Sequence, residues 1–477
     1  MKPLYLTTTL PYVNADPHIG FALECVQADI QARYRSLMGS DVFFNTGTDE
    51  HGLKILQKAR EEGKEPQAYT DEYAEKFRAL KERLGLSEGL HFIRTTDAHH
   101  KSAAQEIWRR CFEKGDIYKK KYKGLYCVGD EMFLKESDLV NGRCPNHPTM
   151  DPIEIEEENY FFRLSAYQDK LTAYLSQVGV IVPEWRRQEA LKFVQSGLED
   201  FSISRDKSRL SWGIPVPGDD SQVMYVWFDA LTNYISTLGW PEDSGGNFKK
   251  FWENGETLQM AGKDQVRFQS IMWQAMLLSA GVKNTDRVVY HGFITSGGQK
   301  MSKSVGNVID PYAIVAEYGT DALRYFLARH IHPFEDSDFT MERFKEAYNA
   351  DLANGIGNLT ARIMTLAETH LEKPIVRPEA NGFPKEYTDA VESYDTNKSL
   401  DFVWTEIQKL DQKIAETKPF TVVKEDAAAG KKLIAELATE LYVIVRMLNP
   451  FMPETNKAIK ETILANKKPA TLFPRKE

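Results

Sequence analysis

The sequence predicts an α/β protein whose parallel-sheet domain is split by an insert and followed by a helical domain. Two patterns lead to this prediction. Strand-like and helix-like segments alternate over residues 1–116, which is typical of a parallel sheet with helices on both faces. After Asp310-Pro311, a good helix start, apolar residues recur three and four positions apart almost to the end, as in helical bundles.

The first strand and helix follow from apolar spacing and from the residues that interrupt it. The β-rich run Lys2–Thr9 predicts a buried strand, which the loop Pro11–Pro17 ends. From His18 onward, apolar residues at helical spacing predict a helix that stops at Gly39.

The next two strands are shorter. Val42–Asn45 predicts a second strand, and Gly47–Gly52 a turn that holds ionisable side chains. His91–Arg94 predicts a third strand, and Asp97 is placed to cap the helix that follows.

The alternation breaks near Lys119. Lys119–Lys121, Cys127–His147 and the acidic run Glu154–Glu158 therefore indicate an insertion. Strand-like runs return at Leu258–Ala261 and Val288–Thr295, on either side of a helical stretch around Phe268–Leu278. Bundle-like spacing is clearest at Asp351–Leu366 and Leu433–Leu448.

Composition excludes several classes of protein. A chain of 477 residues with 42% hydrophobic and 27% charged residues is neither disordered nor fibrous, and it has room for two to four domains. A formal net charge of −9 excludes indiscriminate coating of nucleic acid but leaves a local patch open. No apolar run approaches the ~20 residues of a membrane helix, so we expect a cytoplasmic protein. Four cysteines are too few for a disulfide scaffold, which leaves metal binding or burial.

Two segments have the residue types of a phosphate site. Pro17–Phe21 (PHIGF) lies where a strand hands over to a helix, so free N–H groups, His18 and the close approach allowed by Gly20 suit an anion. Gly297–Ser304 (GGQKMSKS) combines two glycines with alternating Lys and Ser, which predicts a mobile loop with charges for phosphate oxygens. Each segment alone also fits a structural cap or a solvated turn.

Together the two segments resemble the paired signatures of class I aminoacyl-tRNA synthetases. Three more regions are similar to the methionyl-tRNA synthetase family: residues 45–52 (NTGTDEHG) with 10–14 (LPYVN), residues 226–231 (VWFDAL) and residues 262–264 (GKD). The resemblance runs from Leu4 to about Pro453. It implies activation of L-methionine by ATP to methionyl-adenylate and pyrophosphate, then transfer to the 3′ adenosine of tRNA(Met).

The resemblance also gives the predicted domains a role. It implies a Rossmann-like catalytic domain in two halves, a connective insert with a zinc-knuckle-like segment, a region with the KMSKS loop and stem contacts, and an anticodon-binding helical bundle. Their residues are 1–116 and 223–295 for the catalytic halves, 117–222 for the insert, 296–345 for the KMSKS region and 346–477 for the bundle.

The family's pattern assigns the site residues. Methionine needs one carboxylate for its ammonium group and an aromatic pocket for its thioether, whereas its own ionised carboxylate needs no general base to attack ATP. Mg²⁺ is expected with ATP. The implied catalytic residues are His18, Gly20, Lys300 and Lys303. ATP would bind His18, Gly20, Arg205, Gly262, Asp264, Phe293, Ile294 and Lys303. Methionine would bind Thr9, Leu10, Tyr12, Asp49, Trp227, Tyr234, Gln265 and Gln269, and the anticodon would bind Asn358, Arg362 and Phe420.

The chain departs from the family's pattern at several of these positions. Phe21 replaces the second histidine of the phosphate motif, Gln265 and Gln269 replace an apolar residue and a histidine, and Phe420 stands where many members have tryptophan. We expect weakened activation from Phe21. For the two glutamines, two interpretations stay open: a variant pocket that still binds methionine, or an altered choice of amino acid.

The insert has the spacing of a zinc knuckle. Family members of this kind use Cys-x-x-Cys followed by Cys-x-x-His, and this chain has Cys127, Asp130, Cys144 and His147 at those places. A structural zinc and a metal-free relic both remain open. The insert is too short for a large editing domain.

Three alternative functions compete with this interpretation. A different class I synthetase would keep both phosphate motifs but not residues 45–52 and 226–231. A non-enzymatic tRNA-binding paralogue has no need for His18, Lys300, Lys303 and Asp49 together. A small nucleotidyltransferase explains neither the insert nor the bundle. Since no further C-terminal module is recognisable, we expect a monomer.

Overall fold

The computed structural model describes residues 2–128, 132–134, 136–145, 148, 150–301, 307–379 and 382–477. The chain divides into two compact units, which we name the sheet unit and the helical unit. The sheet unit comprises Met1–Pro17, Ser40–Ala79 and Gly89–Tyr290, and the helical unit comprises His18–Gly39, Leu80–Glu88 and His291–Glu477.

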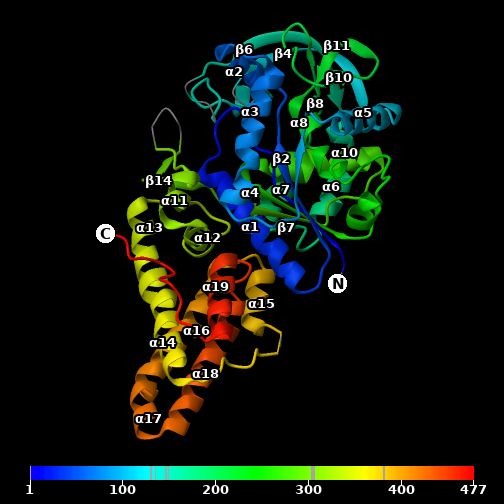
Figure 1. The fold of residues 1–477 in the computed structure, drawn as a ribbon. Helices are drawn as coiled ribbons and strands as arrows, with labels where there is room; N and C mark the ends of the chain where they lie inside the picture. Colours follow the sequence, from blue (N-terminus) through cyan, green and yellow to red (C-terminus); the bar gives the residue numbers. More distant parts are fainter. Residues whose placement is uncertain are drawn as a thin grey trace. The chain divides into compact units, whose positions relative to one another are not determined.

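A six-stranded sheet forms the centre of the sheet unit (Figure 1). Its strand order is β3-β2-β1-β12-β13-β7. β1 pairs in parallel with both β2 and β12, β2 with β3, and β13 with β7. The predicted α/β fold with a parallel sheet is therefore confirmed. The strands are β1 Leu4–Thr7, β2 Val42–Thr48, β3 Leu90–Arg94, β12 Glu256–Gly262, β13 Arg287–His291 and β7 Ile181–Val182.

The second strand is longer than predicted. β2 continues through Gly47 and Thr48, which pair with Ile93 and Arg94 of β3, so the predicted turn Gly47–Gly52 begins inside a strand. A Cβ atom at Gly47 would lie 1.9 Å from the carbonyl oxygen of Ile93. Glycine is present here because the two backbones approach closely, and the chain does not turn until after Thr48.

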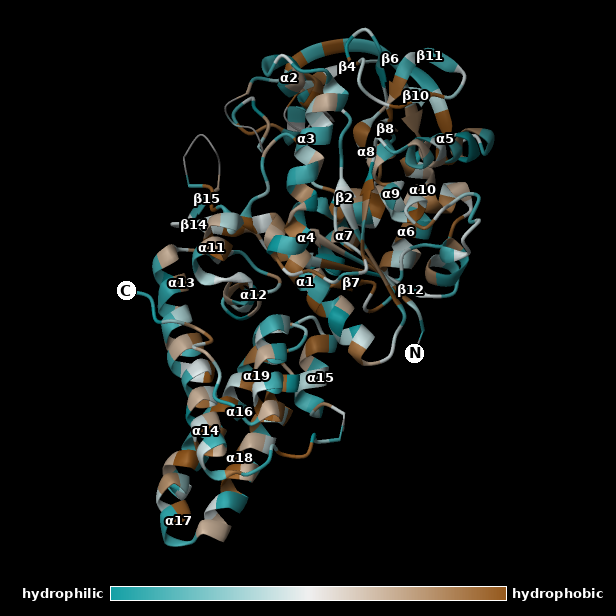
Figure 2. Ribbon diagram, in the orientation of Figure 1, coloured by the Kyte–Doolittle hydropathy of each residue, from teal (hydrophilic) through white to brown (hydrophobic). Residues whose placement is uncertain are grey.

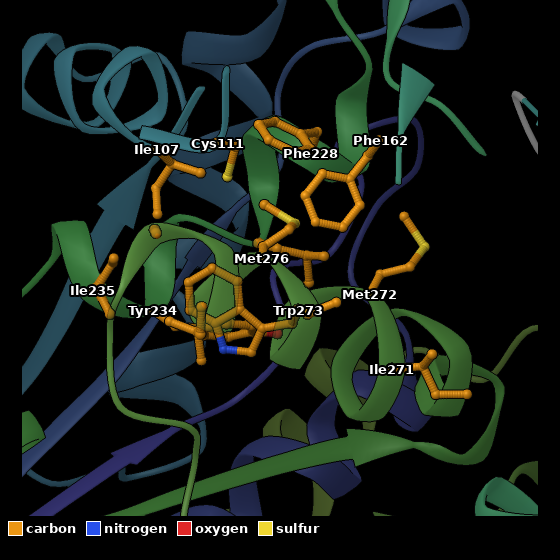
Figure 3. Close-up of a cluster of buried hydrophobic side chains, with 14 of the residues drawn as sticks. Ile107, Cys111, Phe162, Phe228, Tyr234, Ile235, Ile271, Met272, Trp273 and Met276 are labelled. Atoms are coloured by element: carbon orange, nitrogen blue, oxygen red, sulfur yellow. The ribbon is translucent and has the colours of Figure 1, made fainter. Parts of the chain in front are cut away.

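Helices and short helical segments surround this sheet. Trp108, Phe228, Trp252 and Trp273 are among the large side chains that their packing buries. Figure 3 shows part of this core, where side chains of α5, α8 and α10 meet. The helices are α2 Leu53–Glu61, α3 Pro66–Arg78, α5 Ala98–Glu113, α6 Gln168–Leu175, α7 Glu184–Gln195, α8 Val226–Ala230, α9 Asn233–Ser236 and α10 Trp273–Ala280, with π-helical turns at Phe248–Glu253 and Phe268–Met272 and a 3-10 turn at Lys263–Gln265.

Asp97 precedes α5 as predicted, but it does not cap the helix. Its Oδ2 accepts a hydrogen bond from the N–H of Arg94, at 3.0 Å, and makes no side-chain bond to the first turn of α5. The carboxylate therefore closes the turn that follows β3.

The insert is built on an antiparallel sheet, with strand order β5-β4-β6-β8. The long strands β4 and β6 lie side by side (Figure 1). They pair Lys121 with Glu158 and Lys123 with Glu156, so residues of opposite charge are neighbours across the two strands. A second small sheet contains β10, β11 and β9. These strands are β4 Ile117–Cys127, β5 Met132–Leu134, β6 Ile153–Phe162, β8 Phe201–Ser202, β9 Ser204–Asp206, β10 Pro215–Val216 and β11 Asp219–Met224.

The helical unit is mostly α-helix, as predicted. Among its described residues is one small sheet, with order β15-β14-β16, which divides the predicted run Val288–Thr295, because β13 ends at His291 and β14 begins at Ile294 in a different sheet. Hydrophobic residues recur along α18 between hydrophilic ones (Figure 2). The elements are α1 Ile19–Leu37, α4 Leu80–Arg83, β14 Ile294–Ser296, β15 Gln299–Lys300, α11 Pro311–Tyr318, α12 Thr320–Arg329, β16 Ser337–Asp338, α13 Met341–Ala347, a π-helical segment Tyr348–Gly357, α14 Asn358–His370, α15 Lys385–Glu392, α16 Thr396–Thr417, α17 Pro419–Glu425, α18 Ala427–Arg446 and α19 Pro453–Ala465.

One predicted helix start of this unit is confirmed, and one helical stretch contains a kink. Asp310 caps α11 as predicted, since its Oδ1 accepts the N–H of Tyr312 at 2.8 Å. The stretch Asp351–Leu366, where bundle-like spacing was predicted, is helical, but Gly355 has φ −84° and ψ −107° and kinks the chain before α14 begins.

Over the described parts of the chain, none of the helices combines the length and apolar character that crossing a lipid bilayer requires.

Candidate active site

Three of the predicted site segments leave the same edge of the main sheet. Thr9–Tyr12 follows β1, Asp49 follows β2, and Asp264 follows β12. These are neighbouring parallel strands, so their carboxyl ends share one edge, with β1 at the point where the strand order reverses. Ligands of open parallel sheets bind at this position.

Main-chain bonds join the first two of these segments. Asp49 donates its N–H to the carbonyl of Pro11, at 3.0 Å, and accepts the N–H of Val13, at 3.2 Å. Tyr12 lies between these partners and forms a bridge with Asp49. The predicted carboxylate for the ammonium group and one predicted pocket aromatic are thus held side by side, and Asp49 is buried.

The residue after Asp49 anchors this turn. Glu50 is fully buried, and its carboxylate accepts two hydrogen bonds from Arg94, at 2.7 and 2.9 Å, and one each from Thr48 and Thr96. Its carbonyl oxygen accepts the indole N–H of Trp212, at 2.6 Å. The carboxylate and the carbonyl oxygen of Glu50 therefore all have hydrogen-bond donors. This buried network fixes the backbone that presents Asp49.

An aromatic stack supplies one wall beside these segments. Trp227, half-buried on α8, stacks on Phe268 with ring centroids 3.9 Å apart and planes 14° from parallel. Phe268 was not among the predicted site residues, although it lies between Asp264 and Gln269. Gln269 is buried and donates its Nε2 to the hydroxyl of Tyr234, at 2.6 Å.

The other predicted residues of this region lie at the end of β12. Gly262 is its last residue, and Asp264 is exposed on the following 3-10 turn, where its Oδ2 accepts a hydrogen bond from Gln265 at 2.9 Å. Gln265 therefore orients Asp264, whereas Gln269 points to Tyr234. The two glutamines have different partners.

Arg205 lies on β9 and is buried among aromatic rings. Its guanidinium lies over Tyr225 at 4.6 Å, Tyr126 at 5.3 Å and Phe133 at 5.4 Å, and it donates to Ser202 Oγ at 2.9 Å. These contacts fix the cation within the insert region of the sheet unit.

In the helical unit, His18 is the N-cap residue of α1. Its Nδ1 accepts the N–H of Gly20 at 3.1 Å. A Cβ atom at residue 20 would lie 2.9 Å from Cε1 of His18, so glycine leaves room for the imidazole. Since Nδ1 accepts this bond, the neutral ring carries its proton on Nε2, which is then the available donor. Phe21 is buried.

The chain that follows the second phosphate motif returns to the start of α1. Ile19 donates its N–H to the carbonyl of Ile309, at 3.2 Å. Gly297 and Gly298, with φ of 62° and 74°, form a tight turn between β14 and β15, and Ser302–Ser304 of the predicted loop lie outside the described residues. Lys300 belongs to β15, and Lys303 lies outside the described residues.

The predicted adenine segment has its main-chain groups partly engaged. Phe293 donates its N–H to Oδ1 of Asp336 and accepts the N–H of Ser337, both at 2.9 Å. Ile294 begins β14 and is buried. Both main-chain polar groups of Phe293 therefore have partners within the protein.

The predicted anticodon residues lie on two helices. Asn358 is exposed at the start of α14, and Arg362, one turn later, forms an ion pair with Asp411 of α16. Phe420 lies on α17 with 49% of its surface exposed. An exposed ring and an exposed amide are available for bases.

Half of the predicted zinc ligands can be placed. Cys127 and Cys144 are buried in one small apolar cluster with Leu134. Asp130 and His147 lie outside the described residues. Within the described segments no group of three or more His, Cys, Asp or Glu side chains is arranged to hold a metal ion.

Comparison with known proteins gives a consistent family. The family model described as tRNA synthetases class I (M) matches residues 4–153 and 148–364. The chain is 40% identical to the methionine–tRNA ligase of Caldanaerobacter subterraneus, over 97% of this chain and 74% of that relative, and 41% identical to that of Thermotoga maritima, over 98% and 76%.

A solved structure agrees. The Mycobacterium tuberculosis methionyl-tRNA synthetase in complex with methionyl-adenylate is 35% identical and superposes with a TM-score of 0.88, covering 100% of this chain and 99% of that one. The sheet edge, the segment order and these matches together place the chain in the methionyl-tRNA synthetase family of class I, as a methionine–tRNA ligase.

Proposed function

We propose that Asp49 binds the α-ammonium group of methionine, with the Thr9–Leu10 main chain, while Tyr12, Trp227 and Tyr234 line the side-chain pocket. The observation that carries this proposal is the main-chain pairing of Asp49 with the Pro11–Val13 segment at the carboxyl edge of the sheet. A buried carboxylate is a strong partner for an ammonium group, and aromatic rings suit a thioether.

Activation then needs positioning and charge stabilisation. A carboxylate oxygen of methionine forms a bond to the α-phosphorus of ATP, the bond from that phosphorus to the bridging oxygen breaks, and pyrophosphate leaves with the electron pair. His18 donates a hydrogen bond from Nε2 to a phosphate oxygen, and Gly20 allows the phosphate to approach the backbone closely. Lys300 and Lys303 stabilise the negative charge that moves onto pyrophosphate, and Mg²⁺ accompanies ATP as its counter-ion.

The nucleoside is held at two places in this proposal. Asp264, exposed at the end of β12 with Gly262, accepts the ribose hydroxyls, and Gln265 orients it. Ile294 meets adenine, because the two main-chain groups of Phe293 already have partners. Arg205 acts on the triphosphate through the insert region.

The amino-acid choice is tested by ATP–pyrophosphate exchange with a panel of amino acids. Methionine, homocysteine, norleucine and longer analogues differ in length and in the polarity that faces Gln269. Methionine is expected to give the highest kcat/KM. Another amino acid with a higher kcat/KM would show that Gln265 and Gln269 have altered the substrate.

Transfer to tRNA(Met) is proposed to depend on Asn358, Arg362 and Phe420 for the anticodon. Arg362→Ala should lower kcat/KM for charging by about tenfold, since one base contact is worth roughly 1–3 kcal/mol, and leave exchange unchanged. Lys413→Ala, which removes an ion pair with Glu440 in the same bundle, is the matched control. Equal effects of both variants on charging would contradict the assignment.

A structural zinc held by Cys127, Asp130, Cys144 and His147 is proposed for the insert, supported by the shared burial of the two cysteines. Metal analysis of protein purified without added zinc should find one zinc per chain. Folded, active protein without zinc would mean that the knuckle is a relic that binds no metal. A monomer is proposed as the acting form, which light scattering can measure.

A further inference from the structure

Two histidines meet one buried carboxylate close to the proposed methionine pocket. Asp229 Oδ2 lies 2.6 Å from Nδ1 of His51, and Asp229 Oδ1 lies 2.8 Å from Nε2 of His100. None of the three side chains is more than 3% exposed. Both oxygens of one carboxylate are thus used to hold two rings from different parts of the chain.

Each end of this cluster is next to a pocket residue. His51 follows Asp49 by two positions in the turn after β2, and Asp229 follows Trp227 by two positions on α8. The hydrogen bond between His51 and Asp229 therefore joins the turn that presents the ammonium-binding carboxylate to the helix that presents the indole. Trp212 packs on His51 with ring centroids 5.4 Å apart.

The second histidine extends the cluster to another pocket helix. His100, on α5, places Nδ1 2.9 Å from the hydroxyl of Ser236 on α9. Ser236 follows Tyr234 by two positions on that helix. One carboxylate is therefore linked to the three elements that present Asp49, Trp227 and Tyr234.

The charge state agrees with this geometry. Burial alone would raise the pKa of Asp229, but the charge and hydrogen bonds of His51 and His100 hold that pKa below its ordinary value. The carboxylate is ionised at neutral pH and accepts an N–H from each ring. A buried ionised group costs more free energy than an apolar core of the same volume, and such groups can specify one arrangement of the elements they join.

We propose that Asp229 is a positioning residue for methionine: it holds His51 and His100 and so fixes the spacing between Asp49 and Trp227. This inference rests on the proposed roles of Asp49 and Trp227. Asp229 does not touch substrate in this account. It acts on methionine and not on ATP, because its partners lead to the amino-acid pocket.

The test is steady-state exchange kinetics of Asp229→Asn. An amide can accept from only one of the two rings, so the KM for methionine should rise about tenfold, with the KM for ATP changed by less than about twofold. Ser236→Ala, which removes only the end of the cluster, should raise the methionine KM by about twofold to threefold.

The matched control is Asp116→Asn. Asp116 is a buried carboxylate of the same unit that accepts hydrogen bonds from Tyr167 and Ser279, away from the pocket elements. Its loss should lower the melting temperature and leave the methionine KM within about twofold. If Asp229 contributes only to stability, Asp229→Asn should likewise lower the melting temperature and leave the methionine KM unchanged. That result would overturn the proposal.

Asp49→Asn separates the two proposals. If it leaves the methionine KM unchanged, the proposed function of Asp49 fails. If it raises that KM while folded Asp229→Asn does not, only the positioning role fails. Should Asp229→Asn not fold, an unchanged methionine KM in Ser236→Ala overturns the positioning role.

Discussion

The turn that carries Asp49 and the turn that carries His18 are held in different ways. Asp49 is followed by Glu50 and His51, whose buried side chains bond to residues far along the chain. His18 is oriented by one hydrogen bond, from the N–H of Gly20 two residues away. The proposed amino-acid side thus depends on tertiary contacts, whereas the proposed phosphate side depends on local backbone geometry at a helix start.

The helical unit has its own buried carboxylate, but this group lies far from His18. Asp29 and Arg324 are fully buried and 2.8 Å apart, and Asp29 also accepts from Arg33 and Ser87. Along α1, Asp29 lies about 16 Å from His18 at 1.5 Å per residue. Its network should therefore stabilise the unit without setting the phosphate chemistry.

The largest effect is expected from Asp29→Asn, which leaves Arg324 and Arg33 without their carboxylate. The free energy of unfolding should fall by about 3–5 kcal/mol in urea titrations at pH 7. Exchange kinetics of the folded variant should stay within about twofold of the wild type. A large drop in kcat would show that this network does reach the phosphate site.

The same variant gives a pH test. Burial alone would raise the pKa of Asp29, but Arg324 and Arg33 lower it below its ordinary value. A lowered pKa in the folded state stabilises above the unfolded pKa of about 3.9, and this stabilisation is lost as the pH falls through the folded pKa. The difference between wild type and variant should be largest at neutral pH and shrink below about pH 4. A difference independent of pH would contradict the ion pair.

His18→Ala should lower the kcat of exchange by about 100-fold, since one donor to the developing charge is lost. The KM for methionine should change by less than about twofold, because the buried side chains of Glu50 and His51 that hold the Asp49 turn bond to Arg94 and Asp229. Gly20→Ala should act in the same direction by pushing the imidazole aside. A raised methionine KM with normal kcat would contradict this prediction, because it would mean that His18 acts on the amino acid and not on the phosphates.

Glu50→Gln should raise the KM for methionine by about fivefold, the equivalent of roughly 1 kcal/mol, because a new amide donor faces the guanidinium of Arg94. Its effect on kcat should be small. Glu184→Gln, which alters the ion pair between exposed Glu184 and buried Arg187 in the same unit, is the control and should change neither parameter. Equal KM values in both variants would mean that Glu50 does not hold Asp49 in place.

The smallest effect is expected from Phe21→His. A second imidazole near the start of α1 adds a phosphate donor, so the exchange rate should rise by about threefold. An unchanged or lower rate would show that the site has adapted around the buried phenylalanine.

Features that depend on neighbouring residues were predictable from the sequence. β1, α1 and the cap at Asp310 follow from apolar spacing and from residues within four positions of one another. The two-residue strand β7 carries too little pattern to be seen. At Gly47 the sequence suggests a turn, but the glycine is required by the close approach of Ile93. Ile93 lies on a strand more than 40 residues away, so local sequence reasoning could not detect this contact.

The candidate site divides in the same way. His18, Gly20 and Asp49 lie in short motifs that carry their own chemistry. Asp229 lies in the segment 226–231 that resembles the family. Its partners His51 and His100 are 178 and 129 residues away, and no local pattern joins them. Positioning contacts of this kind become visible only when the fold brings their elements together.

The most direct test of the site assignment is a crystal structure of the protein with a non-hydrolysable methionyl-adenylate analogue. We expect the ammonium group within about 3.2 Å of the Asp49 carboxylate, the thioether against Trp227, and the ribose hydroxyls at Asp264. An ammonium group bound by a different carboxylate, or a side chain outside the Trp227–Tyr234 wall, would contradict the assignment.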